Sequence, residues 1–340
     1  MTARQKLLLR NYQSPGDIVM LTAAVRDLHA CYPGQYLTGV STTAQSLWDN
    51  NPYVSLVKQG DPEVTVIDCH YPLIHQSDAA PYHFVWGFSD YLNYVLDLEI
   101  KPTCHRGDIH LSEDERSGLS QVHEITGEDT PFWIVAAGGK YDFTIKWWDT
   151  KRYQEVVDHF ERRIQFVQVG ETGHFHPPLR GVIDLRGKTD TRQLVRLVYH
   201  SYGVVCGVTF LMHLAAAVPM RPGRPPKRAA VIVAGGREPT QWEAYPHHQF
   251  LHTIGCLDCC KTGACWKSRT ARIGDGSEHD DPENLCVDVV DGLPRCMAMI
   301  SAQDVIRRIE MYHEGGNYSY LCFKQYAAAR RAVGCSPGAQ

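Results

Sequence analysis

The chain has 340 residues, of which 44% are hydrophobic and 21% charged, and its formal net charge is −4. This length predicts about two domains, and the acidic balance argues against a general nucleic-acid-binding protein, whose surface would be basic. No apolar run approaches the roughly 20 residues that cross a bilayer, and the N-terminus shows no secretory signal. We therefore expect a cytoplasmic protein without a transmembrane segment.

Short apolar runs alternate with helical apolar spacing in the first hundred residues. Residues 6–11 (KLLLRN) predict a buried strand, and residues 18–32 predict a helix after a Gln-Ser-Pro-Gly-Asp turn. Further short strands are predicted at 36–40, 54–57 and 64–69. This alternation is typical of a parallel sheet covered by helices.

The stretch 71–100 is rich in His, Tyr, Phe and Trp, and its second half predicts an amphipathic helix. We interpret its aromatic side chains as core residues, and a ligand-binding surface is the alternative. The polar stretch 102–130 then indicates the exit from a first domain.

A second alternation of strands and helices begins at Phe132 and predicts a second α/β unit with its own sheet. Strands are predicted at 132–137, 164–169, 203–207 and 229–234, and helices at 148–162, 191–200, 213–217 and 301–312. The tail from Glu314 onward ends in a Gly-, Ala- and Arg-rich stretch and predicts disorder.

Ligands of doubly wound α/β proteins bind where strands end and loops lead into helices, and three loops of this chain meet that description. The first loop, SPGDIV, places Gly16 and Asp17 at the mouth of a helix. Asp17 is either a simple N-cap or a general base that faces an interdomain cleft.

The second loop is AAGGKYDFTIKWW. Gly138 and Gly139 let the backbone approach a ligand closely, and Thr144 and Lys146 are suited to phosphate oxygens. The spacing of a Walker loop is missing. An ordinary surface loop is the alternative.

The third loop, CGVTFLMHLAAA, carries Thr209, Leu211 and His213 at the start of a helix whose N-terminus can receive a diphosphate. The alternative is a buried turn with a structural histidine. Phosphate-friendly loops in the second unit predict a nucleotide-linked donor there and an acceptor on the first unit. That is the arrangement of a two-domain glycosyltransferase.

Six of the twelve cysteines fall between Cys256 and Cys296, in the runs CLDCCKTGACW, LCVDVV and PRCM. In a reducing cytosol such a cluster favours a metal knuckle over a disulfide staple, and free buried cysteines are the third possibility. Zinc is the usual occupant of an all-cysteine site, and iron is equally compatible. The predicted ligands are Cys265, Cys286 and Cys296, with a fourth from Cys259 or Cys260.

Several segments resemble, in order, the landmarks of glycosyltransferase family nine, the ADP-heptose:lipopolysaccharide heptosyltransferases. The segments are KLLLRNYQSPGDIVMLTAAVRDLHACYPG, GGKYDFTIKWWDTKRYQEVVDHF, QVGE, DLRGKTDTRQLVRLV and CGVTFLMHLAAA, which together span about residues 5–255. The cysteine-rich extension is similar to that of the autotransporter heptosyltransferases. That subgroup carries an iron-binding finger, glycosylates serines of autotransporter passenger domains and assembles into large oligomers.

The resemblance implies a GT-B fold, in which two Rossmann-like domains face a cleft, with the cysteine-rich knuckle inserted near the C-terminus. The implied divisions are an acceptor-side domain at 1–125, a nucleotide-sugar-binding domain at 126–255, a cysteine-rich finger at 256–300, and a helix and tail at 301–340. It also favours iron over zinc and a homo-oligomer.

The implied reaction is an inverting transfer of heptose from ADP-heptose to a hydroxyl of a protein serine or a glycan. Asp17 maps onto the general base and Lys146 onto the lysine that stabilises the leaving diphosphate, while Gly170 and Glu171 match a landmark near the nucleoside. Val208 stands where the family has an aspartate, which leaves the sugar open. A non-catalytic nucleotide-sugar-binding or assembly protein is the alternative.

Overall fold

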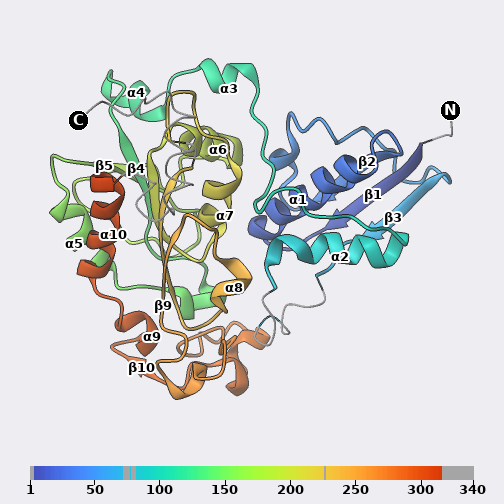
Figure 1. The fold of residues 1–340 in the computed structure, drawn as a ribbon. Coiled ribbons are helices and arrows are strands. Elements are labelled where there is room, and N and C mark those ends of the chain that lie inside the picture. Colours follow the sequence, from blue (N-terminus) through green and yellow to red (C-terminus); the bar gives the residue numbers. More distant parts are fainter. Residues whose placement is uncertain (1–3, 72–76, 78–81, 226, 316–340) are drawn as a thin grey trace, which may run out of the picture.

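The computed structural model describes residues 4–71, 77, 82–225 and 227–315, so the tail predicted from Glu314 onward lies outside the described residues except for positions 314 and 315, which end helix α10. The described residues form two main parallel sheets with helices on their faces (Figure 1). The alternation of strands and helices thus correctly predicts an α/β fold.

The first sheet has the strand order β2-β1-β3, and both strand pairs are parallel. Its strands are β1 (Gln5–Asn11), β2 (Tyr36–Thr42) and β3 (Val64–Asp68). Leu7, Leu8 and Leu9 of the central strand β1 are buried, as expected for a strand covered on both faces.

The prediction of a strand at 54–57 is wrong. Only one bridge forms there, between Val54 and Thr38. Leu56 is 95% exposed, and Val54, which would share its face in a strand, is only partly buried, so no face of the segment is buried along its length.

Helices α1 (Pro15–Cys31) and α2 (Phe84–Leu96) cover the first sheet. Pro15 occupies the first turn of α1, where its missing N–H costs no hydrogen bond. Phe84 and Phe88 of α2 are buried, so the interpretation of this aromatic stretch as core holds for them.

The second sheet has the strand order β6-β5-β4-β7-β8-β9, and all of its strand pairs are parallel. Its strands are β4 (Phe132–Ala136), β5 (Gln165–Gln168), β6 (Ile183–Asp184), β7 (Gly203–Gly207), β8 (Ala229–Gly235) and β9 (Gln249–His252). The four strands that the sequence predicts for the second α/β unit are confirmed. The sequence missed β6 and β9 because both edge strands are short and lack an apolar run.

The second sheet is covered by four longer helices and bordered by two short ones. They are α5 (Thr150–His159), α6 (Thr191–His200), α7 (Phe210–Ala217) and α10 (Ala302–Gly315), with η3 (Tyr141–Lys146) and α8 (Thr240–Glu243) beside the strand ends. The predicted helix at 301–312 is confirmed as α10. Its residues Val305, Ile306 and Ile309 join the core beneath β8 and α5.

The polar stretch predicted as a domain exit contains two short helices, α3 (Glu113–Ser117) and α4 (Gln121–Thr126). Ser112 and Glu115 form a capping box at the start of α3, a signal that the sequence carried. Both helices contact α6 of the second sheet, α3 through the ion pair of Glu115 with Arg192 and α4 through that of Glu124 with Arg196. The domain divisions at 125/126, 255/256 and 300/301 stay predictions.

The two sheets share one continuous hydrophobic core, because α1 packs against α7. Gly16 of α1 lies so close to His213 of α7 that a Cβ at position 16 would be 3.0 Å from the His213 ring carbon Cδ2. The N-terminal ends of both helices therefore meet at one place between the sheets.

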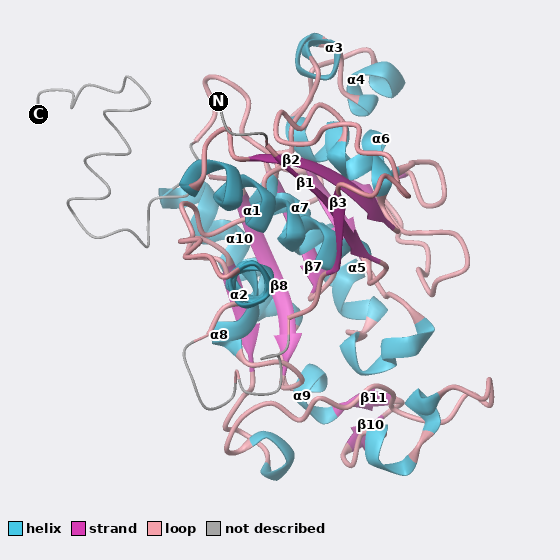
Figure 2. Cartoon of the chain, turned by 90° about the vertical axis from the view of Figure 1, so that its right-hand side faces the viewer, coloured by secondary structure: helices cyan, strands magenta, loops and turns pink. Residues whose placement is uncertain are grey.

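The cysteine-rich segment lies beyond the carboxyl end of β8 (Figure 2). Its short elements are η4 (Asp258–Cys260), η5 (Glu278–Asp280), η6 (Pro282–Asn284), the hairpin of β10 (Val289–Val290) and β11 (Leu293–Pro294), and α9 (Arg295–Ala298). The side chain of Arg269 is fully enclosed in this segment and pairs with Asp275 and Asp280 at 2.7 and 2.6 Å. Its Nε also donates to the Tyr141 carbonyl of η3 at 3.2 Å.

Over the described residues, the helices are too short or too polar to cross a membrane.

We predict that Arg269→Ala lowers Tm by at least about 5 °C, because it leaves two carboxylates of the segment without their cation and removes one of the hydrogen bonds that join the segment to η3. Thermal unfolding and limited proteolysis within residues 270–284 measure the effect. Arg272→Ala, which removes an exposed arginine of the same loop, is the matched control and should leave both readouts unchanged. Equal unfolding curves for the two variants would contradict the anchoring role.

Candidate functional site

A cavity of about 1050 Å³ lies between the carboxyl ends of the two sheets. The loops that follow β1, β2, β4, β5, β7 and β8 all contribute to its wall, which is where ligands bind in open α/β sheets. Of the predicted residues, those that line it are Gly16, Asp17, Gly138, Gly139, Lys146, Gly170, Glu171, Thr209, Leu211 and His213. The three loops chosen from the sequence thus meet at one site.

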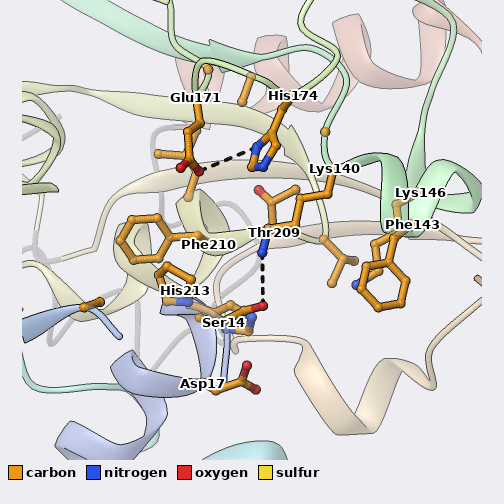
Figure 3. A pocket seen from close by; sticks show the side chains of 18 of the residues that line it. Ser14, Asp17, Lys140, Phe143, Lys146, Glu171, His174, Thr209, Phe210 and His213 are labelled. Carbon is orange, nitrogen blue, oxygen red and sulfur yellow. Dashed lines mark hydrogen bonds and ion pairs between the residues drawn. The ribbon is translucent and has the colours of Figure 1, made fainter. Parts of the chain in front are cut away.

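Asp17 lies in the first turn of α1 and faces the cavity (Figure 3). Burial raises its pKa, although the Tyr71 hydroxyl, which donates to Asp17 Oδ1 at 2.6 Å, partly opposes that shift. Gln13 in turn donates to the Tyr71 oxygen at 3.1 Å and fixes its orientation. The result is an oriented carboxylate with a raised pKa, which is what a general base requires.

Lys146 also lines the cavity, but its charge is already partly balanced. Its Nζ lies 2.7 Å from Glu238 Oε1, and Glu238 also forms an ion pair with its neighbour Arg237. Burial opposes the ionisation of Glu238, yet the charges of Arg237 and Lys146 outweigh it and lower its pKa. The Phe143 ring lies under both cations.

Arg237 and Glu238 are not among the residues predicted from the sequence. The loop GGREP follows the predicted strand at 229–234, and the rule that selected three other strand ends applies equally to this one. Arg237 and Glu238 of this fourth loop line the cavity, and so does Glu243 of α8, the helix that follows it.

His213 is a packing residue rather than an unpaired acid or base. Burial lowers its pKa to about 3, so the ring is neutral near pH 7, and its Nδ1 lies 2.9 Å from the Tyr245 hydroxyl. Thr209 and Leu211 lie on either side of Phe210, the first residue of α7. The N–H groups of this helix end point toward the cavity region and favour an anion.

Glycines shape the wall between β4 and β5. Gly138 has a φ of +92°, and a Cβ there would lie 1.9 Å from the Phe175 carbonyl oxygen, so only glycine fits. Gly139 exchanges two backbone hydrogen bonds with Phe175, which joins the two loops. Gly170 packs against the His176 ring, and the exposed Glu171 lies 3.6 Å from His174.

Thr144 does not line the cavity, which differs from the predicted donor contact. It is buried, and its Oγ1 accepts a hydrogen bond from the Thr270 backbone N–H at 2.9 Å. Thr144 therefore fastens η3 to the cysteine-rich segment.

Lys140, which is not among the residues predicted from the sequence, connects the two sides of the cavity. Its Nζ donates to the Ser14 hydroxyl at 3.3 Å (Figure 3). Because this partner is neutral, the ammonium charge of Lys140 at this bridge is not balanced by it, and it suits an anionic ligand.

Glu243, at the end of α8, is 5% exposed and lines the cavity. Burial and, after it, the negative charge of Glu238 raise its pKa to about 8. Its Oε2 is buried and has no hydrogen-bond partner among the described residues.

The predicted metal ligands gather beside the loop that follows β8. The sulfurs of Cys260 and Cys296 lie 3.1 and 3.3 Å from the positions that a Cβ would take at Gly236 and Gly235, respectively. Burial raises the pKa of Cys296 to about 12.

Cys259, Cys265 and Cys286 belong to the same gathering. Burial raises the pKa of Cys259 to about 11, and the nearby thiols of Cys260, Cys265 and Cys286 add to that shift. Within the described part of the chain, however, no group of three or more His, Cys, Asp or Glu side chains is arranged so that it could hold a metal ion. The donor chemistry fits a thiolate-bound metal, but the arrangement is not a formed ligand set.

No protein-family model matches the chain, and no curated protein matches its sequence. Several solved structures share its fold. A family 9 glycosyltransferase from Veillonella parvula superposes with a TM-score of 0.61 at 14% identity, over 90% of this chain and 96% of that one. E. coli ADP-heptose lps heptosyltransferase II gives 0.53 at 16% identity, over 91% and 99%.

A third similar structure is TibC from enterotoxigenic E. coli, described as an iron-containing dodecameric glycosyltransferase. It gives a TM-score of 0.59 at 14% identity, over 93% of this chain and 77% of that one. A TibC complex with ADP-D-beta-D-heptose gives 0.57 at 13% identity. At these identities the similarity shows a shared fold: the chain has the parallel α/β fold of family 9 glycosyltransferase structures.

We predict that the free energy of unfolding of Glu243→Gln increases relative to that of wild type as the pH rises from about 4.5 toward 8. In that window the unfolded wild type loses the Glu243 proton while the folded protein keeps it, so the wild type loses stability by about 1.4 kcal/mol per pH unit relative to the variant. Chemical unfolding of both proteins at several pH values measures the difference. Below pH 4.5 the slope should vanish.

Glu155→Gln is the control, since Glu155 is exposed on α5. A difference between Glu243→Gln and wild type that stays constant with pH would show that Glu243 is ionised in the folded protein.

Proposed function

We propose that the chain is an inverting glycosyltransferase with a GT-B arrangement, which binds a nucleotide sugar on the second sheet and an acceptor on the first. The observation that carries the proposal is Asp17, an oriented carboxylate with a raised pKa that faces the phosphate-friendly loops of the second sheet across one cavity. The shared fold with family 9 glycosyltransferases supports it.

In the proposed reaction, Asp17 accepts the proton of the acceptor hydroxyl while that oxygen attacks the anomeric carbon of the donor. The bond between this carbon and the diphosphate oxygen breaks, and the nucleoside diphosphate leaves with the electron pair. A base aligned in this way contributes about 10²–10⁴-fold to the rate.

Cations and helix N–H groups stabilise the leaving diphosphate in this proposal. Thr209 and Leu211 mark the N-terminal end of α7, and the Lys140 and Arg237 side chains line the same cavity. Lys146 contributes through a charge that it shares with Glu238, so its role is weaker than that of an unpaired lysine.

We propose ADP-heptose as the donor and a protein serine or a glycan hydroxyl as the acceptor. TibC was solved with ADP-D-beta-D-heptose, and another similar structure is an ADP-heptose lps heptosyltransferase, which supports this donor class. The apolar Val208 lines the cavity wall, so we keep other nucleotide sugars as candidate donors.

A non-catalytic nucleotide-sugar-binding or assembly protein is the second candidate. The observation that favours it is the Lys146–Glu238 ion pair, which reduces the charge available to a leaving diphosphate. Release of nucleoside diphosphate with turnover distinguishes the enzyme from the binding protein.

We also propose that the cysteine-rich segment binds iron, or zinc, through Cys265, Cys286 and Cys296 with Cys259 or Cys260. The gathering of these thiols and the iron of TibC support the proposal. Such a metal would hold the segment together and take no part in the chemistry. The subgroup resemblance and the dodecamer of TibC further support a homo-oligomer.

We predict that Asp17→Asn lowers the rate of sugar transfer by at least about 10²-fold, while the affinity for ADP stays within about twofold of wild type. Asparagine keeps the shape of the side chain but cannot take a proton. Nucleoside diphosphate release is measured with ADP-heptose and other nucleotide sugars, with serine peptides and glycans as acceptors, and ADP affinity is measured by calorimetry.

Asp90→Asn, on the exposed side of α2, is the matched control and should keep full activity. Full activity of Asp17→Asn would show that another group is the base. ADP-heptose binding without turnover for any acceptor would favour the binding protein.

We predict that the purified protein contains about one iron or zinc per chain and that the double variant Cys286→Ser/Cys296→Ser loses it, with a lower Tm and unfolding of residues 255–300. Elemental analysis and hydrogen exchange measure the two effects. Cys31→Ser, a partly exposed cysteine of α1 far from this segment in the chain, is the control. Metal-free wild-type protein with a protected segment would contradict the proposal.

A further inference from the structure

Glu243 is the feature of the cavity that the proposed reaction leaves unexplained. Its side chain is 5% exposed and lines the cavity, and its Oε2 is buried without a hydrogen-bond partner among the described residues. A buried polar atom in this state costs stability unless something supplies the missing partner. A ligand in the cavity is in a position to do so.

The element that carries Glu243 is held firmly. Its neighbour Trp242 is almost fully buried and stacks against Tyr82, with ring centroids 5.9 Å apart, and it packs against Phe84 at 5.0 Å. The Trp242 ring also contacts Tyr71, the residue that orients Asp17. The carboxyl of Glu243 is therefore presented to the cavity by a rigid backbone, as a preorganised binding group should be.

Charges on several elements face this carboxyl. Glu238 and Asp17 disfavour its ionised form, and Lys146 and Arg237 favour it. The phenols of Tyr71 and Tyr245 also interact with it electrostatically. With burial added, the protonated form prevails near neutral pH.

Glu243 lines the same cavity as Asp17, Lys146 and Glu238, and it interacts electrostatically with all three. In the proposed reaction, the acceptor oxygen lies at Asp17 and the diphosphate near the cations. The sugar that is transferred lies between them, because its anomeric carbon joins the two.

We infer, on the basis of the proposed function, that Glu243 is a sugar-specificity residue whose carboxyl binds a hydroxyl group of the donor sugar. A protonated carboxyl both donates and accepts hydrogen bonds, and so does a sugar hydroxyl. A diphosphate only accepts, and it is drawn to the lysine and arginine side chains and to the end of α7.

The test compares ADP-heptose with ADP, because ADP shares the nucleoside diphosphate and lacks the sugar, so that an effect of Glu243 on the sugar appears as a different loss for the two ligands. Affinities of both are measured by calorimetry at pH 7 for wild type, Glu243→Gln, Glu243→Ala and the exposed control Glu155→Ala. We expect Glu243→Ala to bind ADP-heptose roughly tenfold more weakly, the loss of about one hydrogen bond, and to bind ADP as wild type does. Glu243→Gln keeps a donor and an acceptor and should retain most of the affinity.

The pH dependence of the ADP-heptose affinity distinguishes a binding role of Glu243 from a structural one. The ADP-heptose affinity of wild type should fall above about pH 8, where Glu243 ionises, whereas that of Glu243→Gln should not. Unchanged ADP-heptose affinity in Glu243→Ala, or an equal loss for ADP and ADP-heptose, overturns the inference.

The experiment also distinguishes a wrong choice of donor from a wrong role for Glu243. If wild type binds ADP but shows no preference for ADP-heptose, the same titrations are run with other nucleoside diphosphate sugars and their parent diphosphates. A sugar-dependent loss in Glu243→Ala with any of them supports the inference and corrects the donor. No sugar-dependent binding with any of them overturns both the inference and the proposed donor class.

Discussion

The contact between α1 and α7 is the constraint on which the site depends. Gly16 lies against the His213 ring so closely that a Cβ at position 16 would be 3.0 Å from the ring carbon Cδ2 and would force the ring to shift. This contact brings together the first turn of α1, which carries Asp17, and the first turn of α7, whose N–H groups favour an anion. The proposed base and the proposed anion site, which come from opposite sheets, thus become neighbours without a long loop from either one.

The charges around the cavity are arranged so that few of them are independent. Lys146 and Arg237 share the carboxylate of Glu238, and Glu238 in turn disfavours ionisation of Glu243. Asp17 keeps a raised pKa beside these groups because it is buried. A charge change at any one position therefore alters the others, and single variants here should be interpreted with their neighbours.

The sequence predicts the strands that are continuous apolar runs. It does not predict the strands that form only because they pair with a neighbouring strand. Strands β4, β7 and β8 are buried on both faces and stand out as continuous hydrophobic runs. The edge strands β6 and β9 owe their existence to a neighbour in the sheet, which periodicity cannot show. The same limit applies to the site: strand ends located Asp17 and Gly138, but only packing revealed that Lys146 pairs with Glu238.

The cysteine-rich segment is not independent of the site. Cys265 donates its backbone N–H to the Gly236 carbonyl, and Trp266 donates its own to Arg237. Trp266 itself lines the cavity, and Thr144 ties η3 to the segment at Thr270. The segment therefore supports both loops that carry the Lys146–Glu238 pair. A metal bound to its thiols would act on the donor side of the cavity through this backbone, as a structural brace rather than as a participant in the chemistry.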